Sequence, residues 1–213
     1  MKKIITMALM TIPMLFSSNI LAEGFNDNYL QVGYSTSNYK FVDEIMDIEG
    51  SVEIGNNFSI LGRYARETGD WRDPLEYETS TYTGTTIGIG KTFELDTNTS
   101  VTSSLSYLDY DLKQTQKYDS SSTTNHTSSK TNTYIASVGV RNLSDSGIQT
   151  NLKLNIWRAG KLKSKSNEIE LELMKHFSDT LAIGIRVLRH DAKPASSYNS
   201  DWTETGIYVR RSF

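Results

Sequence analysis

The chain has 213 residues, carries a formal net charge of −3 and contains no cysteine. Because a disulfide framework needs cysteine, the fold must be stabilised by burial or by a membrane. A bundle of membrane helices is excluded, since no apolar run of about 20 residues follows residue 22. The length suits one domain.

Residues 1–22 have the three-part layout of a secretory signal. Lys2 and Lys3 precede an apolar stretch, and a polar run leads to the small residue Ala22. We expect cleavage after Ala22 and export of residues 23–213 as one domain. Without the two lysines, the 22 basic residues fall to 20 against 25 acidic ones, a net charge of −5. Such a chain has no concentrated basic face, which excludes nucleic acid as a partner.

From Tyr29 onward, apolar residues recur at every second position, as in Leu30, Val32 and Tyr34. Period two is typical of a strand with one apolar and one polar face. The pattern is repeated in ten segments, at residues 29–38, 42–54, 58–67, 80–93, 100–112, 132–142, 148–158, 167–177, 181–191 and 201–213. The sequence therefore predicts an all-β fold.

The connectors between these segments alternate in length. Short connectors lie at 55–57, 94–99, 143–147 and 178–180, and mostly longer, polar ones lie at 67–79, 113–131, 159–166 and 192–200. Short turns at one end and long loops at the other are typical of an up-and-down antiparallel transmembrane β-barrel whose turns face the periplasm. About ten strands are expected, and eight remain the alternative because the 39–41 connector is short.

Three segments end in one motif, in which two apolar residues, a cation and a phenylalanine occupy alternate positions. The motif is found at 87–93, 171–177 and 207–213. At period two all four side chains point outward, so the cation reaches the membrane interface beside the ring. The sequence predicts an aromatic girdle at this interface, formed by Phe58, Phe93, Phe177 and Phe213.

The terminal segment 206–213 resembles the signal that the barrel-assembly machinery recognises. The exported chain as a whole resembles the small monomeric outer-membrane β-barrels of Gram-negative bacteria. Its architecture is similar to that of the outer membrane protein A transmembrane domain and of opacity and attachment-invasion barrels. The resemblance implies a monomer in the cell outer membrane, in contact with lipid, lipopolysaccharide and the assembly machinery. We expect no cofactor.

The register opposite the apolar one lines the lumen and is rich in charge. It holds Asp43, Asp47, Glu49, Glu53, Arg63, Arg141, Lys153, Glu168, Glu170, Glu172, Arg186 and Arg210. Acidic strands that face cations predict a salt-bridged plug, since barrels of about eight strands are filled by their own side chains. We therefore expect a non-enzymatic barrel with a plugged lumen, whose outer loops contact surface partners. The alternative is a narrow channel for ions or solutes.

The outer loops offer candidate contacts. Trp71 and Tyr77 lie among charged residues in the 67–79 connector. Exposed aromatic side chains there form a binding patch for a host or phage ligand, or stack locally to order the loop. Within the 113–131 connector, the Ser- and Thr-rich stretch 118–130 is expected to be a mobile outer loop.

A second alternative is a hydrolase at the outer rim. The acid pair and the Asp/His pair of the omptin proteases are loosely matched by Asp109, Asp111, His190 and Asp191. The histidine, serine and asparagine of the lipid A deacylase barrels are loosely matched by His190, Ser196, Ser197 and Asn199. Solvated rim charges are the preferred interpretation, because a base and its nucleophile must lie in contact. No spacing of histidine and acidic residues predicts a metal site.

Overall fold

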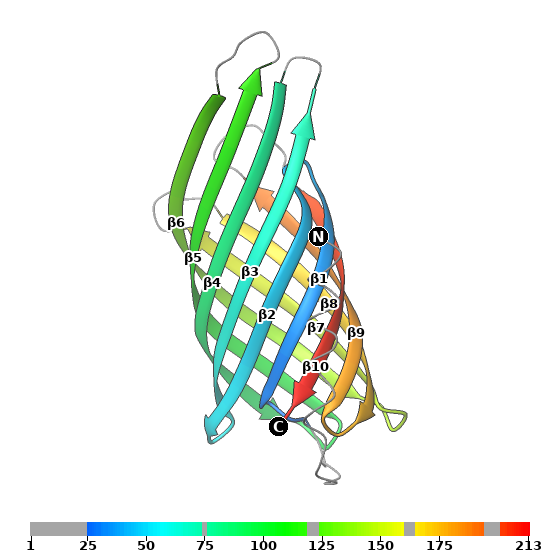
Figure 1. Ribbon diagram of the computed structural model, residues 1–213. Helices are drawn as coiled ribbons and strands as arrows, with labels where there is room; N and C mark the ends of the chain where they lie inside the picture. Colours follow the sequence, from blue (N-terminus) through cyan, green and yellow to red (C-terminus); the bar gives the residue numbers. More distant parts are fainter. Residues whose placement is uncertain (1–24, 74–75, 119–123, 160–164, 194–200) are drawn as a thin grey trace.

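The computed structural model describes residues 25–73, 76–118, 124–159, 165–193 and 201–213. These residues form ten β-strands (Figure 1). In chain order the strands are β1 (Tyr29–Tyr39), β2 (Val42–Gly55), β3 (Phe58–Arg72), β4 (Glu76–Glu94), β5 (Thr99–Tyr118), β6 (Thr124–Leu143), β7 (Ile148–Ala159), β8 (Lys165–Ser178), β9 (Leu181–Lys193) and β10 (Trp202–Ser212). No helix in the described part is long and apolar enough to span a membrane.

Each strand pairs in antiparallel fashion with its neighbours in the sequence, and β1 pairs with β10 to close the sheet. Side chains alternate between the two faces of the wall, as period two requires. In β1, Gln31 and Ser35 are buried in the lumen, whereas Leu30 and Val32 are half exposed on the outside. The predicted up-and-down barrel is confirmed, with ten strands rather than eight.

The outward face of the barrel carries a belt of large apolar side chains. Ile87, Ile169 and Ile207 are exposed to 62 %, 54 % and 63 % of their surface. Soluble monomers rarely expose apolar patches of this extent. The belt is therefore suited to lipid, while the polar register fills the lumen.

The four phenylalanines of the expected girdle lie at the end of the barrel where the turns are short. Phe58 begins β3, and Phe93, Phe177 and Phe213 lie beside the last residues of β4, β8 and β10. Their rings are 42 % to 65 % exposed. Lys91 Nζ lies 4.0 Å from the centroid of the Phe58 ring and donates a hydrogen bond to a carbonyl of the β2–β3 turn. Rings and cations thus share one level of the wall.

Like the turn that joins β8 to β9, the turn that joins β2 to β3 has two residues. Asn56 and Asn57 have φ angles of 52° and 59° there. Asparagine tolerates this left-handed region, and two such residues give a turn whose twist matches that of the flanking strands. The Asn-Asn pair therefore fixes the hairpin at this end.

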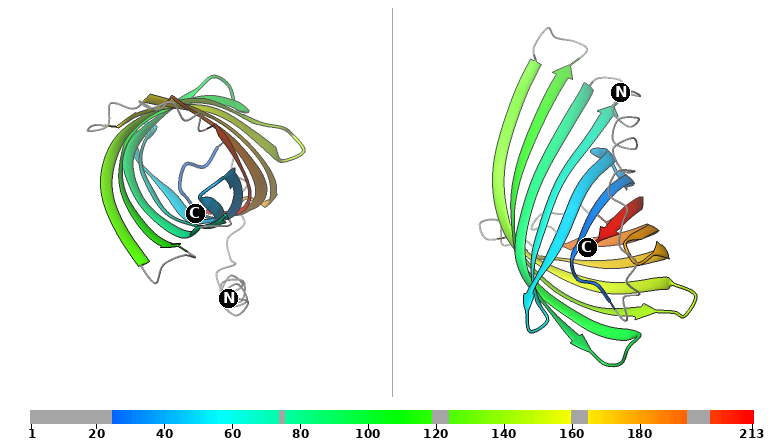
Figure 2. Two further views of the ribbon diagram at one scale, coloured as in Figure 1. Left: turned by 90° about the horizontal axis from the view of Figure 1, so that it is seen from above. Right: turned by 60° about the horizontal axis from the view of Figure 1, so that its bottom comes forward.

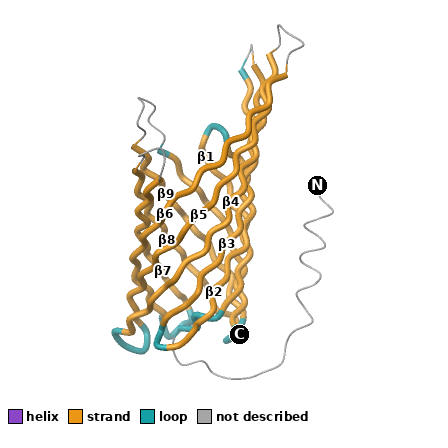
Figure 3. The backbone as a smooth tube through the Cα atoms, turned by 90° about the vertical axis from the view of Figure 1, so that its left-hand side faces the viewer, coloured by secondary structure: helices purple, strands orange, loops and turns teal. Residues whose placement is uncertain are grey.

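Strands β3 to β6 rise well above the rest of the wall (Figures 1 and 3). The loops predicted at 67–79 and 113–131 are wrong, because these residues largely continue the strands. Arg72 pairs with Tyr77 at the top of β3 and β4, and Lys117 pairs with Thr124 at the top of β5 and β6. Threonine and tyrosine favour strands, and pairing satisfies the backbone groups even where no apolar face exists.

The β1–β2 turn leans against the inner face of this tall sheet. The Phe41 carbonyl accepts a hydrogen bond of 2.9 Å from the Ser80 hydroxyl. A Cβ at Gly69 would lie 2.4 Å from the same carbonyl oxygen, so this close approach requires glycine. Val42 and Tyr82 belong to a buried apolar cluster behind the turn. The long-loop end of the lumen is therefore partly lined by apolar groups.

Candidate functional site

One cavity of about 560 Å³ lies inside the barrel. Its lining reaches from Asp27 and Thr92 at the short-turn end to Tyr110 and Trp202 near the long-loop end. Side chains from all ten strands contribute to it. The cavity thus extends along much of the lumen, and its lining is the candidate functional site.

The middle of the lumen holds an ionic cluster centred on Arg186 of β9. Its guanidinium nitrogens lie 2.9 Å from Asp47 Oδ2 and 3.4 Å from Glu49 Oε2, both on β2. Glu170 Oε1 on β8 lies 4.0 Å from the same guanidinium and 3.0 Å from Lys153 Nζ. Several carboxylates therefore surround one buried cation, which offsets the cost of removing it from water.

Two further pairs extend the cluster. Arg63 Nη2 lies 2.7 Å from Asp47 Oδ2, and toward the short-turn end Arg210 Nη2 lies 3.1 Å from Glu172 Oε2. Gln31 joins the second pair, since it accepts a hydrogen bond from Arg210 Nε and donates one to Glu172 Oε1. The ion pairs of this stretch join four cations to four carboxylates, so their charges balance.

Tyr208 of β10 supports the ionic cluster from the side. The guanidinium carbon of Arg186 lies 3.9 Å from the centroid of its ring, a cation–π contact. The Tyr208 hydroxyl lies 2.7 Å from Ser35 Oγ. A Cβ at Gly33 would lie 2.0 Å from the ring, so the missing side chain of this residue makes room for it. The orientation of Arg186 is therefore held by packing as well as by charge.

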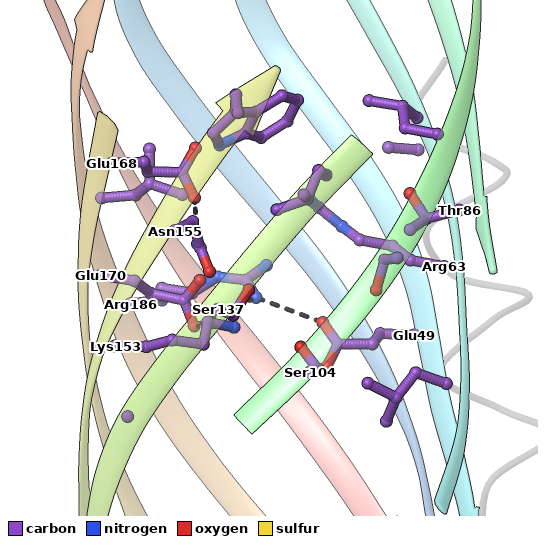
Figure 4. Close-up of a pocket in the computed structure, with 18 of the residues that line it drawn as sticks. Glu49, Arg63, Thr86, Ser104, Ser137, Lys153, Asn155, Glu168, Glu170 and Arg186 are labelled. Atoms are coloured by element: carbon purple, nitrogen blue, oxygen red, sulfur yellow. Dashed lines mark hydrogen bonds and ion pairs between the residues drawn. The ribbon is translucent and has the colours of Figure 1, made fainter. Parts of the chain in front are cut away.

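The wall formed by β4 to β6 presents small side chains to the cavity. Its small lining residues are Gly84, Thr86, Gly90, Thr102, Ser104, Ser106, Ser137 and Gly139, whereas Tyr82, Tyr110 and Arg141 line the cavity nearer its two ends. In Figure 4, Thr86 lies across the pocket from Glu170 and Lys153. This wall was not predicted from the sequence. Its signal is present there, because glycine, serine and threonine occupy the inward positions of β4 to β6 at which other strands carry charged residues. The open space lies between these small residues and the ionic cluster.

Three carboxylates that line the cavity nearer the long-loop end are arranged differently. No lysine or arginine of the described residues forms an ion pair with Glu67, Glu168 or Glu204. Hydroxyl, amide and imidazole groups contact them instead. The two halves of the lumen therefore differ in charge balance.

The segment before β1 crosses the lumen at the short-turn end (Figure 2). The Asp27 carboxylate lies 2.5 Å from Arg141 Nη1 on β6 and accepts a 2.7 Å hydrogen bond from Thr92 Oγ1 on β4. The Phe25 ring centroid lies 4.5 Å from the Arg141 guanidinium carbon. A second cavity of about 400 Å³ is lined by Phe25 and Asn26. This segment therefore narrows one mouth of the lumen.

Two acidic residues expected in the lumen lie outside the ionic cluster. Asp43 and Glu53 are both exposed, and the Asp43 carboxylate accepts a hydrogen bond from a backbone amide of β3. The pairing of β2 with its neighbours shifts near both positions, between Thr36 and Tyr39 of β1 and between Glu53 and Gly55. At Asp43 the shift interrupts strict alternation. Glu53 keeps the inward register opposite Ser59 and is exposed because it lies at the short-turn mouth of the barrel.

The two aromatic residues expected in an outer loop lie in strands. The Trp71 ring centroid lies 6.3 Å from that of Phe41 and 3.7 Å from Lys40 Nζ. Tyr77 pairs with Arg72 across the β3–β4 hairpin. Trp71 therefore packs against the β1–β2 turn, a contact that neither the binding patch nor the local stacking expected from the sequence describes.

The structure does not bring the groups of the omptin-like hypothesis together. Asp109 and Asp111 occupy the outward register of β5, and Asp109 is exposed. His190 is buried in the lumen, where its ring stacks on Trp202 with centroids 3.8 Å apart. Ser196, Ser197 and Asn199 lie outside the described residues. Within the described ranges, no group of three or more histidine and acidic residues is placed to hold a metal ion.

Comparison with known proteins places the chain among outer-membrane barrels by fold alone. The transport unit of the autotransporter AIDA-I from Escherichia coli shares 12 % identity and a TM-score of 0.50, over 98 % of this chain and 97 % of that one. The β-domain of the Bordetella autotransporter BrkA shares 10 % identity and a TM-score of 0.51, over 89 % and 100 % of the two chains.

The attachment invasion locus protein Ail of Yersinia pestis shares 10 % identity and a TM-score of 0.41, over 90 % of this chain and 99 % of that one. No protein-family model and no curated protein matches the sequence. The resemblance to outer-membrane β-barrels is confirmed as a shared fold, and such a fold serves several functions.

Proposed function

We propose that the chain is a non-enzymatic barrel of the Gram-negative outer membrane, with a narrow lumenal passage for ions and small solutes. Residues 1–22 direct export, and the apolar belt contacts outer-membrane lipid and lipopolysaccharide. The short turns face the periplasm, and the terminal strand is the part that the assembly machinery recognises. The separation of Asp109 from His190 supports a role without catalysis.

The observation that carries this proposal is the cavity of about 560 Å³, whose lining extends from residues near the short turns to residues near the long-loop end. The ionic cluster stands beside it, whereas the middle of the β4–β6 wall offers small residues such as Thr86, Ser104 and Ser137. In this proposal the cluster narrows the lumen instead of plugging it. Hydroxyl groups and glycine backbone along one wall give a partly hydrated solute polar partners, while the paired charges opposite set selectivity.

The test is to fill the passage from its small-residue wall. Ser104 lines the cavity on β5, and Ser104→Trp places a large ring in the open space. We expect the purified wild-type barrel to give small, discrete conductance steps in planar lipid bilayers. The substitution should lower the step size by about half or more, since conductance depends on pore width.

The matched control is Leu105→Trp, one residue further along the same strand. Leu105 is 62 % exposed on the outward face, so the added ring enters lipid and conductance should equal that of the wild type. Wild-type protein without any conductance steps would contradict the passage. An equal loss of conductance in both variants would show that the substitutions disturb folding, and it would also count against the passage.

A second candidate function is contact with partners outside the cell. The specific observation is the height of β3 to β6, which rise beyond the strands beside them (Figure 3). Residues 124–132 of β6 lie beyond the last residue that pairs with β7, because that pairing begins at Thr133. Along this edge of β6, the backbone N–H and C=O groups of these residues are not paired with the described residues of β7. Strand edges of this kind bind extended segments of other proteins.

A further inference from the structure

The carboxylates toward the long-loop end are held by uncharged partners. Tyr110 Oη donates a 3.1 Å hydrogen bond to Glu67, and Tyr208 Oη donates one of 3.3 Å to Glu204. Burial of carboxylates without cations is costly unless their charge is offset. Among the described residues, the charge of Arg63 acts on both Glu67 and Glu204, but Arg63 is already paired with Asp47, so this part of the lumen keeps an excess of negative charge.

The third carboxylate approaches the other two across the lumen. Glu168 of β8 accepts a hydrogen bond from the Asn155 amide and lies 3.4 Å from His190 Nδ1. The charge of Arg63 attracts Glu67 on β3, and the charges of Glu204 and Glu168 oppose that attraction. Three separate strands thus direct carboxylates into one part of the cavity, close enough for their charges to interact.

Aromatic rings line the same part of the cavity. Trp202 and Tyr39 lie with their ring centroids 4.9 Å apart, and Tyr82 and Tyr110 with theirs 5.6 Å apart. All four residues belong to the cavity lining. The negative faces of aromatic rings attract cations, and their surfaces cover methylene groups.

One buried hydroxyl in this region has no partner. Thr133 is only 7 % exposed, lines the cavity, and its Oγ1 makes no hydrogen bond with any described residue. A buried polar atom of this kind costs free energy unless a ligand or water satisfies it. It is an observation independent of the carboxylates, and it points to a polar occupant.

We propose that the long-loop half of the lumen binds a linear polyamine, an extended organic cation with several ammonium groups. Each ammonium group pairs with one of Glu67, Glu168 and Glu204, and the methylene chain lies against the rings. A bare metal ion does not suit the site, because in the described structure these carboxylates do not converge on one point. The proposal goes beyond the proposed passage, because a polyamine can bind in this half of the lumen whether or not solutes cross the whole barrel.

Spermidine is the probe, titrated calorimetrically into the purified full barrel in detergent micelles. We expect saturable binding to the wild type. Glu204→Gln should weaken the binding by about tenfold, because a hydrogen-bonded charge pair contributes roughly that much. The amide can still accept the Tyr208 hydrogen bond, and the variant's heat-modifiable migration on gels reports whether it folds.

Glu53→Gln is the matched control, since it removes the same charge from an exposed position at the short-turn end. Its affinity for spermidine should equal that of the wild type. Absence of saturable binding, or equal weakening in both variants, would overturn the site. Equally tight binding of Mg²⁺ would overturn it too, because the site would then be one for inorganic cations.

The conductance measurement separates this proposal from the passage. A barrel that binds spermidine without conducting refutes the passage alone. A barrel that conducts without binding spermidine refutes the polyamine site alone.

Discussion

Arg186 takes part in more of the lumenal ion pairs than any other described side chain. It is 3 % exposed and lies near carboxylates of β2 and β8 as well as the ring of Tyr208. Removal of one partner from a buried pair leaves an uncompensated charge, which costs more than the pair contributes. The stability of the barrel should therefore be most sensitive at this position.

We expect Arg186→Met to lower the free energy of unfolding by about 3–5 kcal/mol, because Asp47 and Glu49 then lose a buried counterion. Urea-induced unfolding of the barrel in lipid vesicles measures this change. Arg189→Met is the control, since Arg189 is exposed on the outward register of the same strand. A loss of similar size in both variants would show that the ionic cluster is not the cause.

Individual lumenal residues could be predicted where strands are regular. Asp47, Glu49, Glu170 and Arg186 share the inward register that period two assigns to them. Asp43 does not, because a shift in pairing between β1 and β2 interrupts the alternation and leaves no mark in the sequence. The role of Asp27, which precedes all strands, depends on contacts with β4 and β6 that no local pattern contains.

At the scale of elements, the β5–β6 hairpin is the largest departure from expectation. Its upper residues are rich in serine and threonine, and the sequence analysis interpreted that composition as a loop. In the structure, pairing runs from Thr99–Asn142 to Lys117–Thr124. Composition alone cannot separate a polar loop from a polar hairpin, because neither has an apolar face and only the pairing differs.

Replacement of residues 113–131 by a short turn should leave the barrel folded, because the described residues of this stretch, 113–118 and 124–131, lie above the level at which β6 begins to pair with β7. The variant should keep heat-modifiable migration and the wild-type conductance steps. Cells that display it should bind less to host-cell monolayers than cells with the full chain, if the tall sheet is the contact surface. The number of attached cells is the measurement.

The matched control changes the same hairpin without shortening it, by Ser128→Ala and Ser129→Ala. Attachment should then stay at the wild-type level, since the backbone edge is intact. Undiminished attachment by the shortened variant would contradict the proposal that the tall sheet contacts partners outside the cell. If the shortened variant no longer migrates as a folded barrel, the expectation that the barrel folds without the upper part of this hairpin is contradicted.

At the scale of the whole molecule, the sorting of side chains is the feature that the sequence predicted most fully. Apolar residues of one register form the outward belt, and polar residues of the other line the lumen. The chain contains no cysteine, so an introduced cysteine is a unique site for a spin label. The orientation of each register is therefore directly measurable.

Spin labels at Ile89→Cys and Leu173→Cys should be accessible to oxygen in lipid vesicles and shielded from a water-soluble relaxing agent, because both positions face the acyl chains. A label at Ser137→Cys, on the lumenal register, should show the reverse. Continuous-wave electron paramagnetic resonance measures both accessibilities. Aqueous exposure at Ile89 or Leu173 would contradict the assignment of the belt to lipid.

The junction between the first and the last strand has a consequence for assembly. Tyr29 pairs with Ser212 there, although almost the whole sequence separates them. Contacts so distant along the chain form late, after the local hairpins. On the inside, Ser35 and Tyr208 are joined across this seam at 2.7 Å, as are Gln31 and Arg210. These lumenal hydrogen bonds thus also hold the first and last strands together. Closure of the barrel and ordering of the lumenal side chains therefore occur in one step.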